Sequence, residues 1–488
     1  MTATLDRPLP VAPIAALPSR SARSSWLGFS AVLGAALMNL LDSTVVSVAA
    51  PVIRHELGGT NATLQWTTAG YTLALAVLLI VGGRLGDVVG RRRMLLIGTV
   101  GFTAVSMLCA LAWSPEVLAG GRVVQGAFAA LMLPQGFGLI RDAFPPAEMA
   151  KPLAAFGPVM GIGAVLGPIV GGFLVDANLF GTGWRMIFLI NLPLGVLTVA
   201  LALKHLPKVA PTAAGTRLDW VSVALSAAGT VLLILPLVQG HELHWPAWTV
   251  VSLVASVPVL AIFARRQSRL ARAGRAPLVE PSLARKRSYV AGVGFATIFF
   301  AAMGAMFTIG LMLQIGLGYS AIGASLMMSP WAFGALVGSG VSGVLMAKLG
   351  RTLLHVGLAL MGAGVLGLVA VYQVVGVELG FAAMALPLLV GGTGMGMIFV
   401  PLFDIVLGGV EDREVGSATG ALSAIEQLGV TLGIAILGTV FFSIVGEAPT
   451  AQSAVDAGSA TALVAAGLIA IGFVLGFALP KRVRAGSH

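Results

Sequence analysis

Apolar runs of about 20 residues recur along the whole chain, and short polar breaks separate them. An α-helix of that length crosses the hydrocarbon core of a bilayer, which is about 30 Å thick. Each run therefore predicts one transmembrane helix. The fourteen predicted helices cover residues 26–50, 64–83, 94–113, 116–140, 152–175, 184–205, 218–239, 247–263, 289–315, 323–347, 352–374, 379–403, 416–446 and 459–480.

The eighth predicted helix, 247–263, is short and contains Pro258, although proline is tolerated in membrane helices. Positive charge supports its presence, because cytoplasmic loops collect Lys and Arg. With the N-terminus inside, 26 of the 29 basic residues fall in inner segments, and loss of this helix alone would invert every later loop. We therefore predict a multi-pass protein of the cell membrane with both termini in the cytoplasm.

The composition excludes several classes of protein. Apolar residues make up 57% of the chain and charged residues 10%, against a usual charged share of about a quarter, so a soluble enzyme is excluded. The net charge of +10 follows the inner loops rather than one face, so no nucleic-acid partner is expected. The single cysteine excludes a thiolate metal cluster, and no P-loop sequence is present. We predict no enzymatic activity, no cofactor and no metal site.

The loop after the second predicted helix has a degenerate copy in the second half of the chain. The first copy, 83–95, pairs Asp87 with a basic cluster, and the second copy, 343–351, has Ala347 in place of the acid. Two pseudo-symmetric six-helix bundles with an inserted helix pair explain this offset. The predicted parts are a cytoplasmic tail (1–25), an N-terminal bundle (26–206), the inserted pair (207–263), a basic cytoplasmic linker (264–288), a C-terminal bundle (289–480) and a second tail (481–488).

Five segments carry a family resemblance. They are 41–51 (LDSTVVSVAAP), 83–95 (GRLGDVVGRRRML, with valine at one usually basic position), 122–126 (RVVQG), 163–172 (GAVLGPIVGG) and 184–195 (WRMIFLINLPLG). Together they resemble the major facilitator superfamily, specifically its 14-helix drug:proton antiporter branch, over nearly the whole chain. The resemblance implies an all-α secondary exporter of amphipathic or cationic organic compounds, powered by inward proton flow through alternating access and working as a monomer in membrane lipid.

Three ionisable residues lie deep within the predicted membrane helices, away from the helix ends: Asp42, Arg122 and Glu426. Insertion of such a group costs about 2.5–3.5 kcal/mol, so it usually faces a cavity or a partner. Helical rise places Asp42 about 24 Å along the first helix and Arg122 about 10 Å below the outer face, so both occupy one outer layer. Glu426 lies about 15 Å from the inner edge, near the midplane.

These depths predict roles in proton coupling. Proton exchange needs a carboxylate whose proton affinity changes with access, and both Asp42 and Glu426 have this chemistry. Asp42 is the predicted coupling acid, and the resemblance implies that Arg122 with Gln125 takes part in proton transfer. Glu426 is the predicted substrate-side carboxylate. The alternative for Asp42 is a structural hydrogen bond in the first helix, shared with the two hydroxyl residues that follow it, and structural roles also stay open for Arg122 and Glu426.

The segment 163–172 is what the family calls its antiporter motif. Gly163, Gly167 and Gly171 repeat every fourth residue and let another helix approach closely, while Pro168 removes a backbone donor. Gly172 completes the motif. Helix packing and a conformational hinge are both open interpretations.

The segment 83–95 predicts a conformational latch. Gly83 and Gly90 permit turns around the acid Asp87 and the basic cluster that begins at Arg91. By resemblance, Asp87 faces the positive N-terminal end of the thirteenth predicted helix, and Arg91 pairs with Asp142. The latch would hold the two halves together in the outward-facing state.

Two other features have both a functional and an ordinary interpretation. Phe299, Met303, Met306 and Phe307 fall on one face of the ninth predicted helix. They could line an adaptable substrate pocket together with Glu426 and Gln125, or could contact lipid or pack against another helix. The eight basic residues of 264–288 could bind anionic lipid headgroups or simply mark an inner linker.

Two alternatives to a multidrug exporter remain. One is a dedicated exporter of a single endogenous metabolite or lipid-like compound. The other is a membrane sensor that transports nothing, which predicts no flux under an imposed gradient and tolerance of Asp42→Asn.

Overall fold

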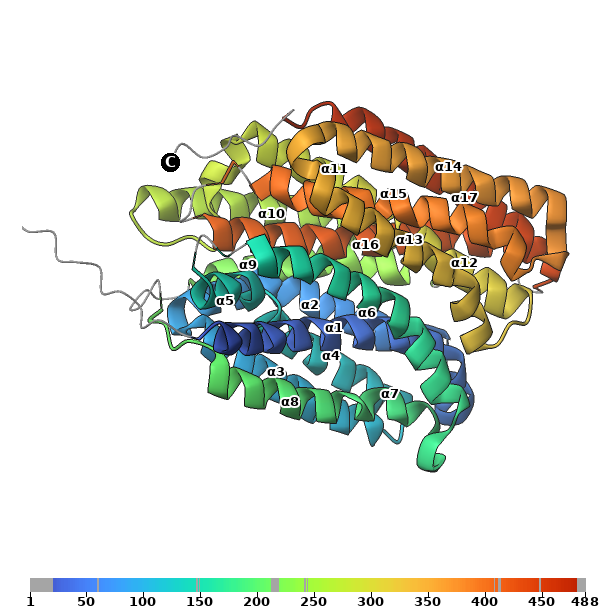
Figure 1. Ribbon diagram of the computed structural model, residues 1–488, viewed down its shortest axis with the longest axis horizontal. Coiled ribbons are helices and arrows are strands. Elements are labelled where there is room, and N and C mark those ends of the chain that lie inside the picture. Colours follow the sequence, from blue (N-terminus) through green and yellow to red (C-terminus); the bar gives the residue numbers. More distant parts are fainter. Residues whose placement is uncertain are drawn as a thin grey trace, which may run out of the picture.

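The computed structural model describes residues 21–58, 61–145, 148, 150–211, 219–240, 243, 245–407, 409–410, 414–446 and 449–480. Within these ranges the chain is helical and contains no strand. The long helices run side by side along the longest axis of the molecule (Figure 1). Most of the first predicted tail and all of the second lie outside the described residues.

The first part of the chain forms one group of helices. The helix α2 packs on α4, and α1 contacts both α6 and α8. These helices lie together in the blue-to-green half of Figure 1. Their bounds are α1 Ala22–Leu57, α2 Asn61–Val89, α3 Arg91–Ala110, α4 Pro115–Met132, α5 Gln135–Ala143, α6 Ala150–Asp176, α7 Met186–Leu189 and α8 Asn191–His205.

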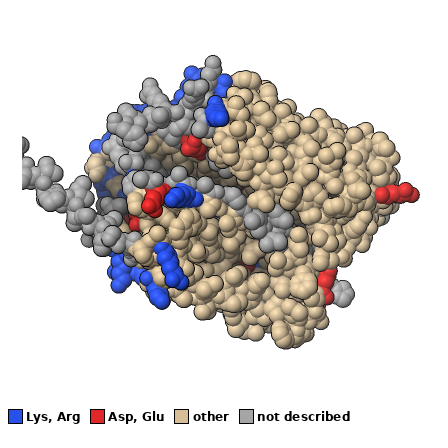
Figure 2. All heavy atoms as spheres, in the orientation of Figure 1, with Lys and Arg blue, Asp and Glu red and all other residues tan. Residues whose placement is uncertain are grey.

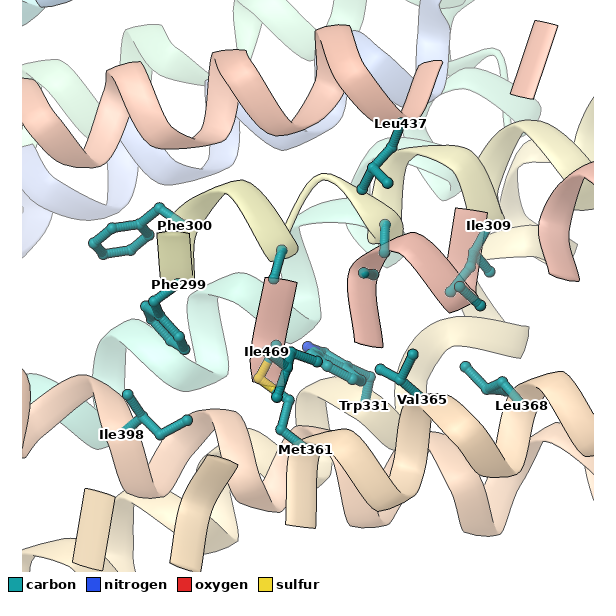
Figure 3. Packing of buried hydrophobic residues seen from close by; sticks show 14 of the residues in the cluster. Phe299, Phe300, Ile309, Trp331, Met361, Val365, Leu368, Ile398, Leu437 and Ile469 are labelled. Carbon is teal, nitrogen blue, oxygen red and sulfur yellow. The ribbon is translucent and has the colours of Figure 1, made fainter. Parts of the chain in front are cut away.

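A hairpin of two helices, α9 (Trp220–Gln239) and α10 (Ala247–Arg272), follows this group. The remaining helices share one large apolar core in which Phe299, Trp331 and Met361 are buried (Figure 3). These remaining helices are α11 Arg287–Ala302, α12 Ala305–Leu311, α13 Ala321–Leu349, α14 Arg351–Val375, α15 Phe381–Leu407, α16 Val415–Val445 and α17 Ala451–Gly476.

The structure contains twelve stretches of described helix that are long and apolar enough to cross a membrane. All fourteen predicted spans are helical, and the two that are not among these twelve are 116–140 and 152–175. The first of the two is divided into α4 and α5 at Leu133 and Pro134, and the second is α6. The all-α membrane fold is therefore confirmed, and a count of fourteen is compatible with it.

The structure differs from the predicted helices at two places that matter below. The helix α10 continues to Arg272, nine residues beyond the predicted end, so the predicted linker begins as a helix. The ninth predicted helix is broken at Met303 and Gly304 into α11 and α12. Gly304 lies against α16, where an added Cβ would be 2.4 Å from the carbonyl carbon of Gly433.

Basic residues gather at one end of the molecule. Figure 2 shows Lys and Arg over the end at which α1 begins, while the middle of the visible face carries almost no charge. This distribution agrees with the positive-inside rule.

A linker between α10 and α11 lies at this basic end and ties several helices together. On one side, Gln267 of α10 accepts a hydrogen bond from the Leu278 backbone N–H at 2.8 Å. On the other side, the Glu280 backbone N–H donates to Ser417 Oγ of α16 at 2.9 Å. The buried carboxylate of Glu414, just before α16, accepts from Ser282 and Lys286. The inserted hairpin is thereby fixed to the beginning of α16.

Candidate functional site

A buried ion pair joins α1 to α4 in the first group of helices. Asp42 is 2% exposed and Arg122 is 0% exposed, and Arg122 Nη1 donates to Asp42 Oδ2. The sequence placed both residues in one layer by helical rise, and the structure brings them into contact. Their predicted role in proton coupling is a separate question from this geometry.

Two amides complete the surroundings of the Asp42 carboxylate. Gln125 Nε2 donates to Asp42 Oδ1 at 3.0 Å, and Asn191 Nδ2, at the start of α8, donates to the same oxygen at 3.2 Å. Both amides also donate to Ser106 Oγ of α3, at 2.7 Å and 3.3 Å. Residues of four helices therefore form this cluster around Asp42. Sequence reasoning selected Gln125 but missed Asn191 and Ser106.

The Arg122 side chain is fixed by further contacts. Its Nε donates to the Thr67 carbonyl at 2.9 Å, and its Nη1 donates to Gln125 Oε1 at 2.6 Å. The guanidinium carbon lies 4.2 Å from the centre of the Tyr71 ring, within the range of a cation–π contact. The positive charge therefore stays beside Asp42 in this conformation.

The hydroxyls next to Asp42 bond within their own helix. Ser43 Oγ donates to the Leu40 carbonyl at 2.9 Å, and Thr44 Oγ1 donates to the same carbonyl at 3.0 Å. Both hydroxyls therefore donate to a backbone carbonyl one turn earlier on α1.

The hydrogen bonds around Asp42 have one direction. The side chains of Arg122, Gln125 and Asn191 all donate to it, which suits an ionised carboxylate. A protonated carboxyl would need an acceptor instead. Asn191 Oδ1 is buried and accepts no hydrogen bond within the described structure, so rotation of this amide would supply one. The cluster can therefore accommodate both protonation states.

Glu426 lies elsewhere, on α16, and is half-buried. Two residues earlier, Ala424 packs into a cluster with Tyr71 and Leu75 of α2. Three residues later, Gly429 lies against α11, where an added Cβ would be 2.7 Å from Phe300 Cβ. The part of α16 that carries Glu426 therefore contacts both the first helices, through Ala424, and the C-terminal core, through Gly429.

The four residues predicted to share one apolar face of the ninth helix do not share one face in the structure. Phe299 lies in α11, is 2% exposed and packs against Phe295 and Phe300 in the C-terminal core. Phe307 lies beyond the break, in α12, and is 37% exposed. Met303 and Met306 lie at the break and are partly buried against the same core. The break at Gly304 turns the two phenylalanines onto different helices.

The glycines of the predicted antiporter motif lie on α6 at close helix contacts. A Cβ added to Gly167 would lie 2.3 Å from Thr44 Oγ1, and one added to Gly163 or Gly171 would meet α1 within 2.8 Å. Gly172 faces a different helix, α13, where an added Cβ would lie 2.8 Å from the Ile322 Cα. The helix runs through Pro168 without a break. The close approach predicted for these glycines is present, and their role as a hinge stays a prediction.

A family model described as the Major Facilitator Superfamily matches residues 32–434. The chain belongs to this superfamily. A probable actinorhodin transporter of Streptomyces coelicolor is 48% identical, with 91% of this chain and 77% of the relative covered. The tetracenomycin C resistance and export protein of Streptomyces glaucescens is 31% identical, with 91% and 81% covered. The puromycin resistance protein of Streptomyces alboniger is 29% identical, with 97% and 94% covered.

Membership of the Major Facilitator Superfamily means that this chain is a multi-pass membrane transporter of small molecules. Its relatives include antibiotic and multidrug exporters. The predicted family is therefore confirmed.

The predicted latch of this superfamily member lies at the basic end. Asp87 forms ion pairs with Arg84 at 3.6 Å and Arg91 at 3.4 Å, and Arg91 also contacts Asp142 at 3.5 Å. Burial raises the pKa of Asp142, and the nearby Arg91 opposes that shift. The backbone at Gly90 has φ of 109°, which glycine tolerates, and Gly83 lies within α2.

Asp87 also borders the beginning of α16. One small cavity is lined by Ile80, Arg84 and Asp87 of α2, Pro277, Leu278 and Glu280 of the linker, and Ser417 and Gly420 of α16. The linker therefore lies against the junction between α2 and α16, which the sequence did not predict.

Proposed function

We propose that this protein is a secondary active exporter, a proton antiporter that moves amphipathic or cationic organic compounds out of the cell by alternating access. The observation that carries the proposal is the buried Asp42 carboxylate with Arg122, Gln125 and Asn191 around it. A buried acid in a membrane helix is costly, and such groups usually mark a proton or substrate path.

In the proposed cycle, Asp42 binds a proton when the site is open to the outside and releases it to the cytoplasm. After release, Arg122 Nη1 donates to the carboxylate as it does in this structure. Protonation removes the charge that holds Arg122, and rotation of the Asn191 amide then provides an acceptor for the new O–H. The latch at Asp87 and the glycines of α6 would transmit this change to the two halves. The protein works as a monomer in this scheme, and no cofactor takes part.

The substrate class rests on the relatives and on Glu426. Proteins related to this chain are named for resistance to or export of tetracenomycin C and puromycin. A half-buried carboxylate on α16, the helix that contacts both α2 and α11, would attract the positive end of an organic cation. Antibiotic-like organic compounds are therefore the proposed cargo.

A second candidate function is export of one particular compound. The relative that is 48% identical is named a probable actinorhodin transporter, which favours a dedicated exporter for actinorhodin or a compound like it. In that case the protein would discriminate strongly against unrelated drugs.

One experiment tests both candidates. Purified protein in liposomes is given an imposed pH gradient and a panel that contains actinorhodin, puromycin, lipophilic cations and neutral drugs. Accumulation of several cations against their gradient supports the multidrug exporter, whereas accumulation of actinorhodin alone supports the dedicated exporter. No gradient-driven flux of any compound would reject both and leave the sensor hypothesis.

A further inference from the structure

The hairpin helix α10 presents one side to the surroundings of the protein. Its exposed apolar side chains recur at helical spacing and share a single face. The opposite face carries Thr249, Ser256 and Gln267, which are buried. The exposed apolar residues are Val250, Val251, Val254, Val257 and Ile262. In a membrane protein such a face contacts the lipid tails.

The same face continues as a row of arginines. At 100° per residue, Arg265, Arg269 and Arg272 fall within the arc occupied by the exposed valines, and all three are exposed. Arg266 points elsewhere and forms a two-bond ion pair with Asp219 at 2.6 and 2.7 Å. No carboxylate in the described part of the chain pairs with the other three. We call Arg265, Arg269 and Arg272 the arginine row.

Tryptophans mark where the membrane ends. Trp248, at the beginning of α10, is 39% exposed, and Trp220, at the beginning of α9, is 70% exposed. Tryptophan prefers the two membrane interfaces. Trp248 and Arg265 are 17 residues apart, or about 26 Å along the helix, which is close to the hydrocarbon thickness of about 30 Å.

A contact between α9 and α10 independently gives the same depth for Arg265. Asp219 directly precedes Trp220 and binds Arg266, so Trp220 and Arg265 lie at one level. From there the arginine row extends about 10 Å further along α10. Its guanidinium groups therefore lie at the headgroup level of the inner leaflet, directly beyond the face that contacts the lipid tails.

We propose that the arginine row is a binding site for the headgroup phosphate of an anionic phospholipid. Guanidinium groups bind phosphate through two parallel hydrogen bonds, and a lipid whose tails lie along the valine face would place its phosphate beside the row. If the three arginines were only solvated by water, there would be no reason for them to lie on the same side of α10 as the lipid-facing valines. The site is independent of the substrate that the protein transports.

The test is the triple variant Arg265→Gln, Arg269→Gln and Arg272→Gln, with a matched control. The control Arg23→Gln, Lys151→Gln and Lys208→Gln removes the same charge from exposed positions outside the hairpin. Each protein is reconstituted with a mixture of phosphatidylglycerol and phosphatidylcholine, extracted gently, and analysed by native mass spectrometry for retained lipid.

The wild type and the control should retain phosphatidylglycerol, and the row variant should lose about tenfold or more of it. Retained phosphatidylcholine should not change. Equal retention by the row variant and the control, or an equal loss from both, would overturn the proposal. The single variant Arg269→Gln should lose an intermediate amount, which covers the case in which the triple variant fails to fold. Displacement by inorganic phosphate alone would show an anion site that does not need the lipid tails, and would also contradict the proposal.

Discussion

Asp42→Asn is the sharpest test of the proposed coupling. Asparagine has nearly the same shape as aspartate but carries no charge and cannot release a proton. Its amide oxygen can still accept from Gln125 and Asn191, which both donate to Oδ1. Its amide nitrogen would face Arg122 Nη1, so two donors would oppose each other where the ion pair was.

The structure bounds the cost to stability. Removing one partner of a buried ion pair costs about 3–5 kcal/mol when the other charge is left alone. Here Arg122 keeps the Thr67 carbonyl, Gln125 Oε1 and the Tyr71 ring. We therefore expect a loss of about 1–3 kcal/mol, which the protein should survive.

Asp42→Asn should abolish the transport of substrate that is driven by the proton gradient. One proton moving down a gradient of one pH unit supplies about 1.4 kcal/mol, which supports about a tenfold substrate gradient. The Asn variant should support none. It should still exchange substrate across the membrane when no gradient is imposed, because binding uses other groups.

The assay compares uphill accumulation and exchange in liposomes that contain equal amounts of folded protein. Asp456→Asn, at an exposed position on α17, is the control and should behave as the wild type. If Asp42→Asn still accumulates substrate about tenfold under the same gradient, Asp42 is not the coupling acid and the proposed mechanism fails.

Four further predictions follow from other contacts. Asn191→Leu removes a donor to Asp42 and the acceptor for its protonated form. The pH profile of transport should therefore shift, while substrate exchange without a gradient persists. An unchanged pH profile would show that Asn191 has only a structural role. Gly172→Ala places a Cβ 2.8 Å from the Ile322 Cα, so the thermal unfolding temperature should fall, with a loss of about 1–3 kcal/mol, and transport should slow. Asp87→Asn should lower the stability by less than about 1 kcal/mol in the same unfolding measurement, because its ion pairs are partly exposed. It should nevertheless lower the initial transport rate. A wild-type rate would contradict the role of Asp87 in a latch. Glu426→Gln should weaken binding of cationic substrates about tenfold and spare neutral ones, and an equal effect on both would contradict its assignment.

Matched variants separate these effects from general damage. Thr198→Val, on the same helix as Asn191, should leave the pH profile unchanged. Gly467→Ala lies on α17 with nothing within 4 Å, so it should not destabilise the protein. Asp176→Asn, at the exposed end of α6, should leave the initial rate unchanged.

The sequence predicted the depth of Asp42 and Arg122 because depth depends only on helical rise and on the position of the polar breaks. It could not predict that Asn191 and Ser106 join them. Those contacts depend on how α3 and α8 are rotated about their axes, and rotation is set by packing between distant segments. The only indication in the sequence was that Asn191 lies inside an apolar run, and this does not indicate which residue it contacts.

Two of the differences between the predicted and the observed helix bounds have identifiable physical causes. The break between α11 and α12 arises where Gly304 approaches Gly433, a contact between residues far apart in the sequence. The extension of α10 to Arg272 differs from the prediction because a cluster of arginines interrupts the apolar pattern, although arginine is a good helix former. Apolar periodicity therefore located the membrane spans but not their ends.

The linker between α10 and α11 also determines where this protein could be cut or enlarged. At Gly274 the backbone has φ of 67° and a Cβ would meet nothing within 4 Å, so a peptide tag inserted there should find open space. Four residues later, Leu278 is bonded to Gln267 and borders the junction of α2 with α16. A tag at that point would separate the hairpin from α16. The same short connection thus offers one permissive site for fusion proteins and, four residues further on, a site that should tolerate none.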